Sequence, residues 1–506
     1  MMTFTFKRLL YQLHRWTGIA ACVLMLLWFI SGMVMLFVGY PKLTPWERLG
    51  ALPQLQLAGC CQSLAQVDIP VDAREIVLTT LAGAPVYRVR DGAGRPRLFD
   101  AASGQRLPPA SRDTALASAR AFVPGADAQY LGLLQEDRWT HSRSLDAHRP
   151  LHQVQMMDAA QTMLYLSSVT GEVLLDAPRE QRLWNFVGAW LHWVYPLRNH
   201  STDPVWSWIV IIASAAATLT ALTGTLAGIW RWRFKGRYKS GARTPYRESW
   251  MRWHHVTGLL FAGIVCAWIF SGLMSMNPLR IFDPQGQRPD LAAWQGGTPA
   301  TVRLAVTPPQ ALKLLAEHGF RAVELEWRVL DGQPYLLARD GAARTRLLMR
   351  QDGQLVVREQ WPQEQLLQAA DKLMPGMVEG VEWLTSHDAY YYGREPEAMM
   401  GAMERRLPVL RLRFSDPHAN WVYLDPYTGT VALGLDRRQR VSRWLFSFLH
   451  SWDLPPLLRT GPWREAVLIL LSLGGTLLSA TGIVIGWRRL RLCWRARAAR
   501  QAGGQG

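Results

Sequence analysis

Four long apolar runs dominate the hydropathy pattern of the chain. They cover residues 16–39, 205–230, 256–276 and 466–487, and the middle of each lacks Asp, Glu, Lys and Arg. A helix needs about 20 consecutive apolar residues to cross a bilayer, so each run is long enough to span one. The first run exceeds the roughly 7–15 apolar residues of a cleaved signal peptide, and no small-x-small cleavage site follows it. The pattern predicts an integral membrane α-helical protein with four transmembrane helices.

The two long segments between these spans, residues 40–204 and 277–465, have the pattern of α+β domains. Their β-rich runs are separated by turns such as Asp331-Gly332 and Asp340-Gly341, and residues 308–318 have helical spacing. The expected strands are 76–81, 86–90, 97–99, 163–168, 172–175, 322–330, 334–339, 344–350, 421–424 and 430–433. Amphipathic stretches at 182–192 and 443–450 precede the second and fourth spans and predict short interfacial helices, each ended by prolines.

One phrase occurs twice along the chain. It reads Leu-His-Arg-Trp-Thr-Gly at 13–18, where the first span begins, and Trp-His-His-Val-Thr-Gly at 253–258, where the third begins. Further matches follow in the same order: 83–92 with 332–341, Thr170-Gly171 with Thr428-Gly429, His192 with His450, and Thr223-Gly224 with Thr481-Gly482. The chain is therefore expected to hold two parallel copies of a span, a long segment and a span. Such copies predict a pseudo-twofold four-helix transmembrane bundle whose axis lies along the membrane normal.

The formal net charge of +17 is concentrated beside the spans. Residues 1–20 carry three basic and no acidic side chains, residues 231–252 eight basic and one acidic, and residues 488–500 six basic and none acidic. Basic segments beside spans stay in the cytoplasm, and this placement disfavours nucleic-acid binding. The expected order, in a bacterial inner membrane, is 1–39 cytoplasmic N-terminus and first span, 40–204 periplasmic, 205–230 second span, 231–252 cytoplasmic loop, 253–276 third span, 277–465 periplasmic, 466–487 fourth span and 488–506 cytoplasmic tail.

Four histidines occupy equivalent positions in the two copies. His14 and His254 are expected at the inner rim, and His192 and His450 at the outer rim. Equivalent side chains face each other across a pseudo-twofold axis, and two facing imidazoles suit the axial positions of a haem. A lone interfacial histidine more often only hydrogen-bonds, and a Zn or Cu site is a weaker alternative because no third ligand accompanies either pair. His255 stays a candidate beside His254, although adjacent helical residues point about 100° apart and both cannot reach one iron.

Glycines and cysteines bear on the kind of cofactor. The second and fourth spans share Gly-x-x-x-Gly, at Gly224/Gly228 and Gly482/Gly486. Such glycines let helix backbones approach closely, and they equally leave room for a flat ligand. The chain has no Cys-x-x-Cys-His, so covalent attachment of a c-type haem is unsupported. The adjacent pair Cys60-Cys61 leaves the question of a disulfide open.

Together these features resemble the PepSY-associated transmembrane family, which includes iron-regulated inner-membrane proteins and ferric-siderophore reductases. The resemblance rests on the phrase at 14–18, the repeated α+β segments, Trp-Val-Tyr-Leu-Asp-Pro-Tyr-Thr-Gly at 421–429 and the Leu-His before each outgoing span. It implies PepSY-type periplasmic domains and two b-type haems whose iron is held by His14, His254 or His255, His192 and His450. The first copy departs from the pattern, since it has Ser-Val-Thr-Gly at 168–171 where the second has Asp-Pro-Tyr-Thr-Gly.

The function expected from this resemblance is that of an inner-membrane di-haem oxidoreductase. It would reduce a periplasmic ferric siderophore or other Fe(III) chelate and so release Fe(II). The chain has no Gly-x-Gly-x-x-Gly after a strand, so electrons must come from a partner: a flavin reductase, an NAD(P)H-linked enzyme or a quinol. One alternative is a membrane-anchored PepSY module that binds a peptidase or an iron-uptake partner without redox activity. Another is a metal transporter, disfavoured because the spans lack the buried carboxylates of ion pathways.

Overall fold

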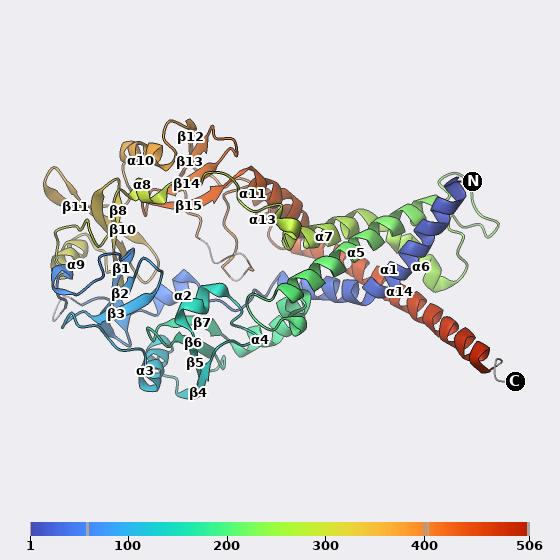
Figure 1. Cartoon of the computed structure of the whole chain (residues 1–506), viewed down its shortest axis with the longest axis horizontal. Coiled ribbons are helices and arrows are strands. Elements are labelled where there is room, and N and C mark those ends of the chain that lie inside the picture. Colours follow the sequence, from blue (N-terminus) through green and yellow to red (C-terminus); the bar gives the residue numbers. More distant parts are fainter. Residues whose placement is uncertain (1, 57–59, 397, 400, 402–403, 503–506) are drawn as a thin grey trace. The chain divides into compact units, whose positions relative to one another are not determined.

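The chain divides into two compact units. The computed structural model describes residues 2–56, 60–396, 398–399, 401 and 404–502 (Figure 1). One unit, here called the helical unit, comprises the chain up to Gly39, Trp184–Asp283 and the chain from Arg438 on. The other, here called the sheet unit, comprises Tyr40–Leu183 and Pro284–Arg437.

The helical unit contains the apolar spans. Helices α1 (Met2–Met35), α5 (Pro204–Arg231) and α14 (Pro462–Ala502) are long and apolar enough to cross a membrane. Helix α1 packs against α5 and α14. Large apolar side chains such as Ile212 and Leu470 are more than 60% exposed on these helices, as expected of surfaces that face lipid. These features are those of a membrane protein, and the chain also carries extensive β-sheet.

The third predicted span, 256–276, is not one continuous helix. It is broken at Phe261 into α6 (Ser249–Leu260) and α7 (Ala262–Ser275), which are bent by 73°. No proline marks the break. A Cβ added at Gly474 of α14 would lie 2.4 Å from the Phe261 ring, so the ring packs directly on the α14 backbone. The equivalent residue of the unbroken α1 is the small Ala21, so this aromatic contact is specific to the second copy.

Short helices precede the two remaining spans. Helix α4 (Arg179–Asn185) leads into a π-helical turn at Phe186–Trp190, and α11 (Arg437–Ser442) leads into another at Arg443–Phe448. Helices α12 (Leu449–Ser451) and α13 (Pro455–Leu458) follow the second π turn. The amphipathic patterns at 182–192 and 443–450 are thus helical, but their π geometry was not expected.

The strands of the sheet unit form antiparallel sheets. Within the described residues there is one seven-stranded sheet in the order β11-β10-β9-β8-β1-β2-β3, and two four-stranded sheets in the orders β4-β5-β6-β7 and β12-β13-β14-β15. The strands of the first copy are β1 (Glu75–Leu81), β2 (Ala84–Arg90), β3 (Pro96–Asp100), β4 (Ala128–Leu134), β5 (Leu151–Met156), β6 (Met163–Ser167) and β7 (Val173–Ala177). Those of the second are β8 (Glu324–Leu330), β9 (Gln333–Arg339), β10 (Thr345–Gln351), β11 (Gln354–Arg358), β12 (Val378–Leu384), β13 (Val409–Phe414), β14 (Trp421–Asp425) and β15 (Thr430–Leu435).

Strands β1 and β8 join the two copies into one sheet. Val77 pairs with Glu326, and Ile76 pairs with Trp327 one position away. Val77 and Glu326 are equivalent positions of the repeat, so the copies pair symmetrically about this point. The two long segments were expected as separate domains, but their strands share one apolar core that includes Leu78, Leu325 and helix α9 (Pro308–Glu317).

Four further helices cover the sheet unit: α2 (Pro45–Gly50), α3 (Arg112–Phe122), α8 (Leu291–Gln295) and α10 (Gln363–Ala370). Helix α3 packs on β4 and β5, and α8 lies against α10. Cys60 and Cys61, whose pairing the sequence left open, are joined in a disulfide that packs against the core of the seven-stranded sheet. Cys22, Cys266 and Cys493 are free thiols in the helical unit.

Candidate functional site

The first histidine pair joins α1 to α6. The ring centroids of His14 and His254 are 6.3 Å apart, and their planes are tilted by 34°. His14 Nδ1 lies 3.1 Å from the backbone carbonyl of Thr220 on α5. His254 Nδ1 lies 3.0 Å from the hydroxyl of Thr481 on α14. Each ring is therefore held by its Nδ1 against one of the other spans.

The second pair comes from the segments that follow the π turns. The ring centroids of His192 and His450 are 6.0 Å apart, with planes inclined at 72°. His192 Nδ1 lies 3.0 Å from Ser31 Oγ on α1, and His450 Nδ1 lies 3.0 Å from Ser271 Oγ on α7. Ser31 and Ser271 are equivalent residues of the repeat, so the second pair has the same support in both copies.

The partners of Nδ1 define which nitrogen of each ring carries the proton. The carbonyl of Thr220 can only accept a hydrogen bond. The three hydroxyls already donate their own protons to backbone carbonyls: Ser31 to Leu27, Ser271 to Trp268 and Thr481 to Leu478. In all four rings Nδ1 must then donate, and Nε2 keeps a free lone pair. Among the residues that the structure describes, none hydrogen-bonds to Nε2 of these four histidines.

The spacing within each pair suits one metal ion between two imidazoles. An imidazole nitrogen binds a metal at about 2.0–2.1 Å and lies roughly 1.1 Å from its ring centre, so two rings on opposite sides of one metal have centroids about 6.3 Å apart. The observed separations are 6.3 Å and 6.0 Å. The described part of the chain has no cluster of three or more His, Cys, Asp or Glu suited to a metal, so any metal held here has two protein ligands per site.

Gly224 leaves the space that the His14 ring occupies. A Cβ added at Gly224 would lie 2.5 Å from His14 Cε1, which is too close for a carbon–carbon contact. A Cβ at Gly482 would lie 3.5 Å from His254 Cε1, and Cβ atoms at Gly32 and Gly272 would lie 3.7 Å and 3.8 Å from the rings of His192 and His450, which are ordinary contacts. The donor set of each pair, two imidazoles with Nε2 available, fits the iron of a haem.

The second glycine of each Gly-x-x-x-Gly has another role. A Cβ at Gly228 would lie 3.0 Å from Leu259 Cδ2, and a Cβ at Gly486 would lie 3.3 Å from Ile19 Cγ1. These positions allow close helix packing. Close helix packing, one of the two interpretations of the motif, is confirmed for its second glycine; room for a flat ligand stays a prediction.

His255 differs from its neighbour His254. Its Nδ1 lies 2.6 Å from the Thr244 hydroxyl and its Nε2 lies 2.9 Å from the Gly228 carbonyl. The ring is also flanked by Trp232 and Tyr246. Since both nitrogens are engaged, His255 ties the 231–252 loop to the helices, and His254 is the member of this dipeptide with a nitrogen available for a metal.

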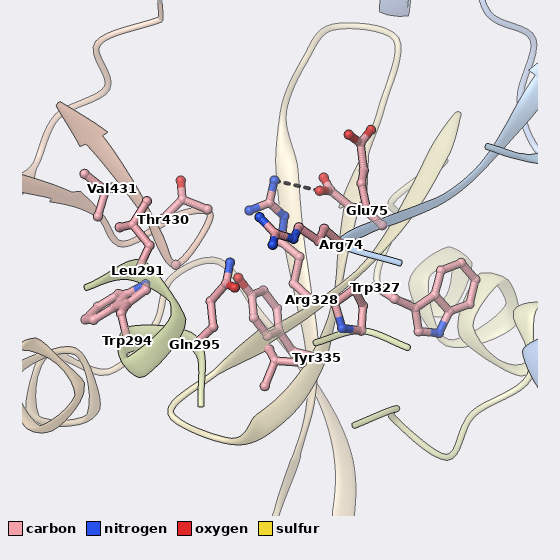
Figure 2. A pocket seen from close by; sticks show the side chains of 14 residues that line it. Arg74, Glu75, Leu291, Trp294, Gln295, Trp327, Arg328, Tyr335, Thr430 and Val431 are labelled. Atoms are coloured by element: carbon pink, nitrogen blue, oxygen red, sulfur yellow. Dashed lines mark ion pairs between the residues drawn. The ribbon is translucent and has the colours of Figure 1, made fainter. Parts of the chain in front are cut away.

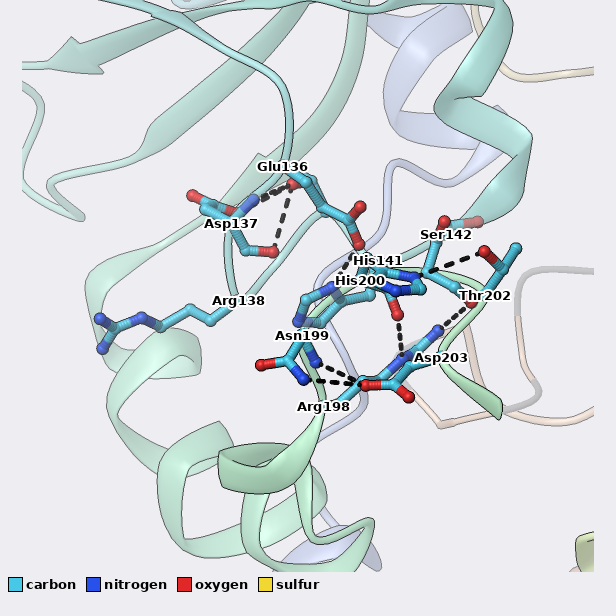
Figure 3. A network of polar contacts seen from close by, with 12 residues as sticks. Glu136, Asp137, Arg138, His141, Ser142, Arg198, Asn199, His200, Thr202 and Asp203 are labelled. Atoms are coloured by element: carbon cyan, nitrogen blue, oxygen red, sulfur yellow. Dashed lines mark hydrogen bonds and ion pairs between the residues drawn. The ribbon is translucent and has the colours of Figure 1, made fainter. Parts of the chain in front are cut away.

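Figure 3 shows other polar groups of the chain. The Asp203 carboxylate accepts hydrogen bonds from the backbone and side-chain amides of Asn199. It also accepts hydrogen bonds from the backbone amides of Val205 and Trp206 and so caps the start of α5. In the sheet unit His141 Nδ1 pairs with the Glu136 carboxylate. These contacts stabilise local structure.

Sequence reasoning did not assign the residues that orient the rings. Ser31, Ser271 and Thr481 were part of the aligned repeat, but their role as acceptors for Nδ1 depends on which helices are neighbours. A signal was present, because Ser-Gly recurs 17 residues after each inner-rim histidine and Thr-Gly recurs in both outgoing spans.

Comparison with known proteins agrees with this architecture. No curated protein matches the chain. The profile of one family, described as the PepSY-associated TM region, matches residues 11–489, which is nearly the whole chain and includes all four paired histidines. The match covers both copies of the repeat and the sheet unit between the spans. The chain therefore belongs to the PepSY-associated transmembrane family.

Proposed function

We propose that this protein binds two b-type haems and carries electrons across the bacterial inner membrane to a ferric chelate, from which Fe(II) is then released. The observation that carries the proposal is the geometry of the two histidine pairs. Their ring centroids are 6.3 Å and 6.0 Å apart, every Nδ1 makes a hydrogen bond, and no Nε2 has a hydrogen-bond partner among the described residues. His14 and His254 would hold one haem, and His192 and His450 the other.

The proposal includes a membrane arrangement. The helices α1, α5 and α14 and the bent pair α6–α7 would act as four spans around a pseudo-twofold axis. Both termini and the basic 231–252 loop would face the cytoplasm, because basic segments remain on that side. The sheet unit, formed from both long segments, would then face the periplasm as PepSY-type domains.

Bound haem would supply reversible one-electron chemistry between Fe(III) and Fe(II). The chain's own residues fix how that chemistry is tuned. Hydrogen bonds from Nδ1 to Thr220, Thr481, Ser31 and Ser271 orient the rings and raise the basicity of Nε2, which favours the ferric state. All four partners are neutral oxygens, so both sites receive support of the same kind.

The two sites lie at different depths along α1. Seventeen residues separate His14 from Ser31, which at the rise of an α-helix is about 26 Å. Phe29 and Trp268, whose ring centroids are 6.2 Å apart, lie within one helical turn of Ser31 and Ser271, near the level of the outer pair. They would extend the aromatic surroundings of that site towards the inner pair.

Partners follow from the same proposal. Electrons would enter from a flavin reductase, an NAD(P)H-linked enzyme or a quinol, and would leave to an Fe(III) chelate of hard oxygen donors. Such chelators prefer a hard cation, so reduction to Fe(II) weakens their hold on iron. The protein would therefore have to transfer an electron to the chelated Fe(III), and would not have to coordinate that iron itself.

A stopped-flow experiment tests this function. The purified protein is reduced with dithionite, freed of excess reductant, and mixed with a ferric hydroxamate or catecholate in the presence of an Fe(II) indicator. We expect a haem Soret band that reoxidises as one Fe(II) appears per electron lost. A colourless protein would refute the proposal and leave a membrane-anchored PepSY module, and a coloured protein that no ferric chelate reoxidises would refute the substrate class.

A further inference from the structure

A cavity of about 270 Å³ opens in the sheet unit beside the junction of β1 and β8 (Figure 2). Its walls come from the start of β1, from β8 and β9, from α8 and from the turn that opens β15. Ligand cavities for drug-sized molecules measure about 300–1,000 Å³, so this one suits a small molecule or a single arm of a larger one.

Aromatic side chains form the flat part of the wall. Trp294 and Tyr335 both line the cavity and are almost fully buried. The Tyr335 hydroxyl donates to the Thr428 carbonyl at 2.7 Å. Gly429, at φ +66°, brings the turn so close that an added Cβ would lie 2.8 Å from the Tyr335 hydroxyl. This turn and the two aromatic side chains together bound one wall of the cavity, against which a planar group could lie.

Two arginines supply positive charge to the same cavity. Figure 2 shows the side chains of Arg74 and Arg328 at one side of the cavity. Arg74 makes no ion pair or side-chain hydrogen bond with any residue that the structure describes, and its side chain is exposed. Arg328 pairs with Glu326 at 2.7 Å through one terminal nitrogen, and its side chain keeps 27% of its surface exposed. A guanidinium has five N–H donors, so this one ion pair leaves others for a ligand.

The carboxylates near the cavity are already neutralised by other arginines. Glu75 pairs with Arg88 at 3.1 Å and with Arg90 at 3.2 Å. Glu326 pairs with Arg339 at 2.7 Å as well as with Arg328. Burial would raise the pKa of Glu326, but the arginine charges outweigh burial and lower it to about 2, so this carboxylate stays ionised.

The ion-pair network beside the cavity has one more cation than anion. Its arginines are Arg48, Arg88, Arg90, Arg328 and Arg339, and its glutamates are Glu75, Glu172, Glu324 and Glu326. Arg74 on the cavity wall lies outside this network and adds a second positive charge that no carboxylate offsets. The cavity therefore borders a region of net positive charge.

We propose that this cavity binds a small aromatic carboxylate, with the carboxylate on Arg74 and Arg328 and the ring against Trp294 and Tyr335. A guanidinium presents its N–H groups as a planar fork that matches a carboxylate, and a flat ring can lie against the aromatic wall. Under the proposed function, such a group would be one arm of the chelate. That last step rests on the proposed function, whereas the binding site does not.

Binding is tested on the full chain in detergent by ¹⁹F NMR with 4-fluorobenzoate. We expect saturable binding at or below about 1 mM, the affinity of a good fragment of that size. The neutral analogue 4-fluorobenzamide has the same shape and should bind at least about tenfold more weakly, because it lacks the charge that the arginines match. Equal binding of the two probes, or no saturable binding of the benzoate, would overturn the proposal.

Variants give the matched controls. Arg74→Gln removes a charge that makes no internal contact, so the fold should be intact while benzoate binding falls about tenfold or more. Arg95→Gln removes an arginine that is 70% exposed and paired with Asp91 outside the cavity, and should bind as the native protein does. Unchanged binding in Arg74→Gln would overturn the site. Since the readout does not involve haem, benzoate binding by a colourless protein would refute only the proposed function.

Discussion

Gly224→Ala is the substitution whose effect the geometry of the inner pair defines most sharply. The new Cβ would lie 2.5 Å from His14 Cε1 and 2.9 Å from its Nδ1. Carbon atoms in contact are about 3.5–4.0 Å apart, so the ring must retreat by roughly 1 Å. Metal–ligand bonds hold within about 0.2 Å, so such a shift removes His14 from an iron held by His254. We expect the inner haem to lose one axial ligand while the outer haem is unchanged.

The repeat offers the matched control for this prediction. Gly482→Ala places a Cβ 3.5 Å from His254 Cε1, which is ordinary contact, and Gly263→Ala on α7 meets nothing within 4 Å. Both should keep two haems. The assay is the optical spectrum of purified oxidised protein together with haem content per chain. Alanine is favoured over glycine in helices by about 1 kcal/mol, so loss of helix stability does not explain a defect. Two intact haems in Gly224→Ala, or equal loss in Gly482→Ala, would refute the reasoning.

Three further predictions concern the supports of the rings and the sheet unit. Ser31→Ala and Ser271→Ala remove the hydrogen-bond acceptors of His192 and His450, so each should weaken the affinity for the outer haem by about 10–100-fold. The measurement is haem transfer to apomyoglobin, and unchanged haem retention would contradict the proposed role of these hydroxyls. His255→Ala should keep both haems in the same assay, since both ring nitrogens of His255 are engaged by protein, and loss of the inner haem would instead make His255 a ligand. The folded-state pKa of Glu326 is lowered to about 2, so its ion pairs stabilise the fold above its ordinary pKa of 4.5, and this stability is lost as the pH falls from there towards 2. The free energy of unfolding of the sheet unit in urea should therefore fall less between pH 5 and pH 3 in Glu326→Gln than in the native protein. An identical fall in both proteins would contradict this.

Local patterns predicted ten of the fifteen strands in the described residues, and they missed β4, β5, β11, β12 and β13. The expected strand 76–81 is β1 at Glu75–Leu81, and 421–424 is β14 at Trp421–Asp425, because alternation and turn residues act within a few positions. The repeat also predicted that His14 would face His254 and His192 would face His450, since equivalent residues meet across a pseudo-twofold axis. That these rings bind haem stays a prediction.

Features that depend on neighbouring elements could not be predicted. At the bend, Phe261 packs on Gly474 of a helix more than two hundred residues away, and no proline marks the bend. The pairing of Val77 with Glu326 joins two segments that share no local signal for contact. The free Nε2 atoms depend on which oxygen lies beside each Nδ1, as with His254 and Thr481, and this is fixed only by helix packing.

The haem content of the purified chain tests the central claim most directly. A pyridine haemochrome assay should give two b-type haems per chain for the native protein, one for His14→Ala, one for His192→Ala, and none for the variant that carries both substitutions. Two haems in the double variant, or none in the native protein, would contradict the account.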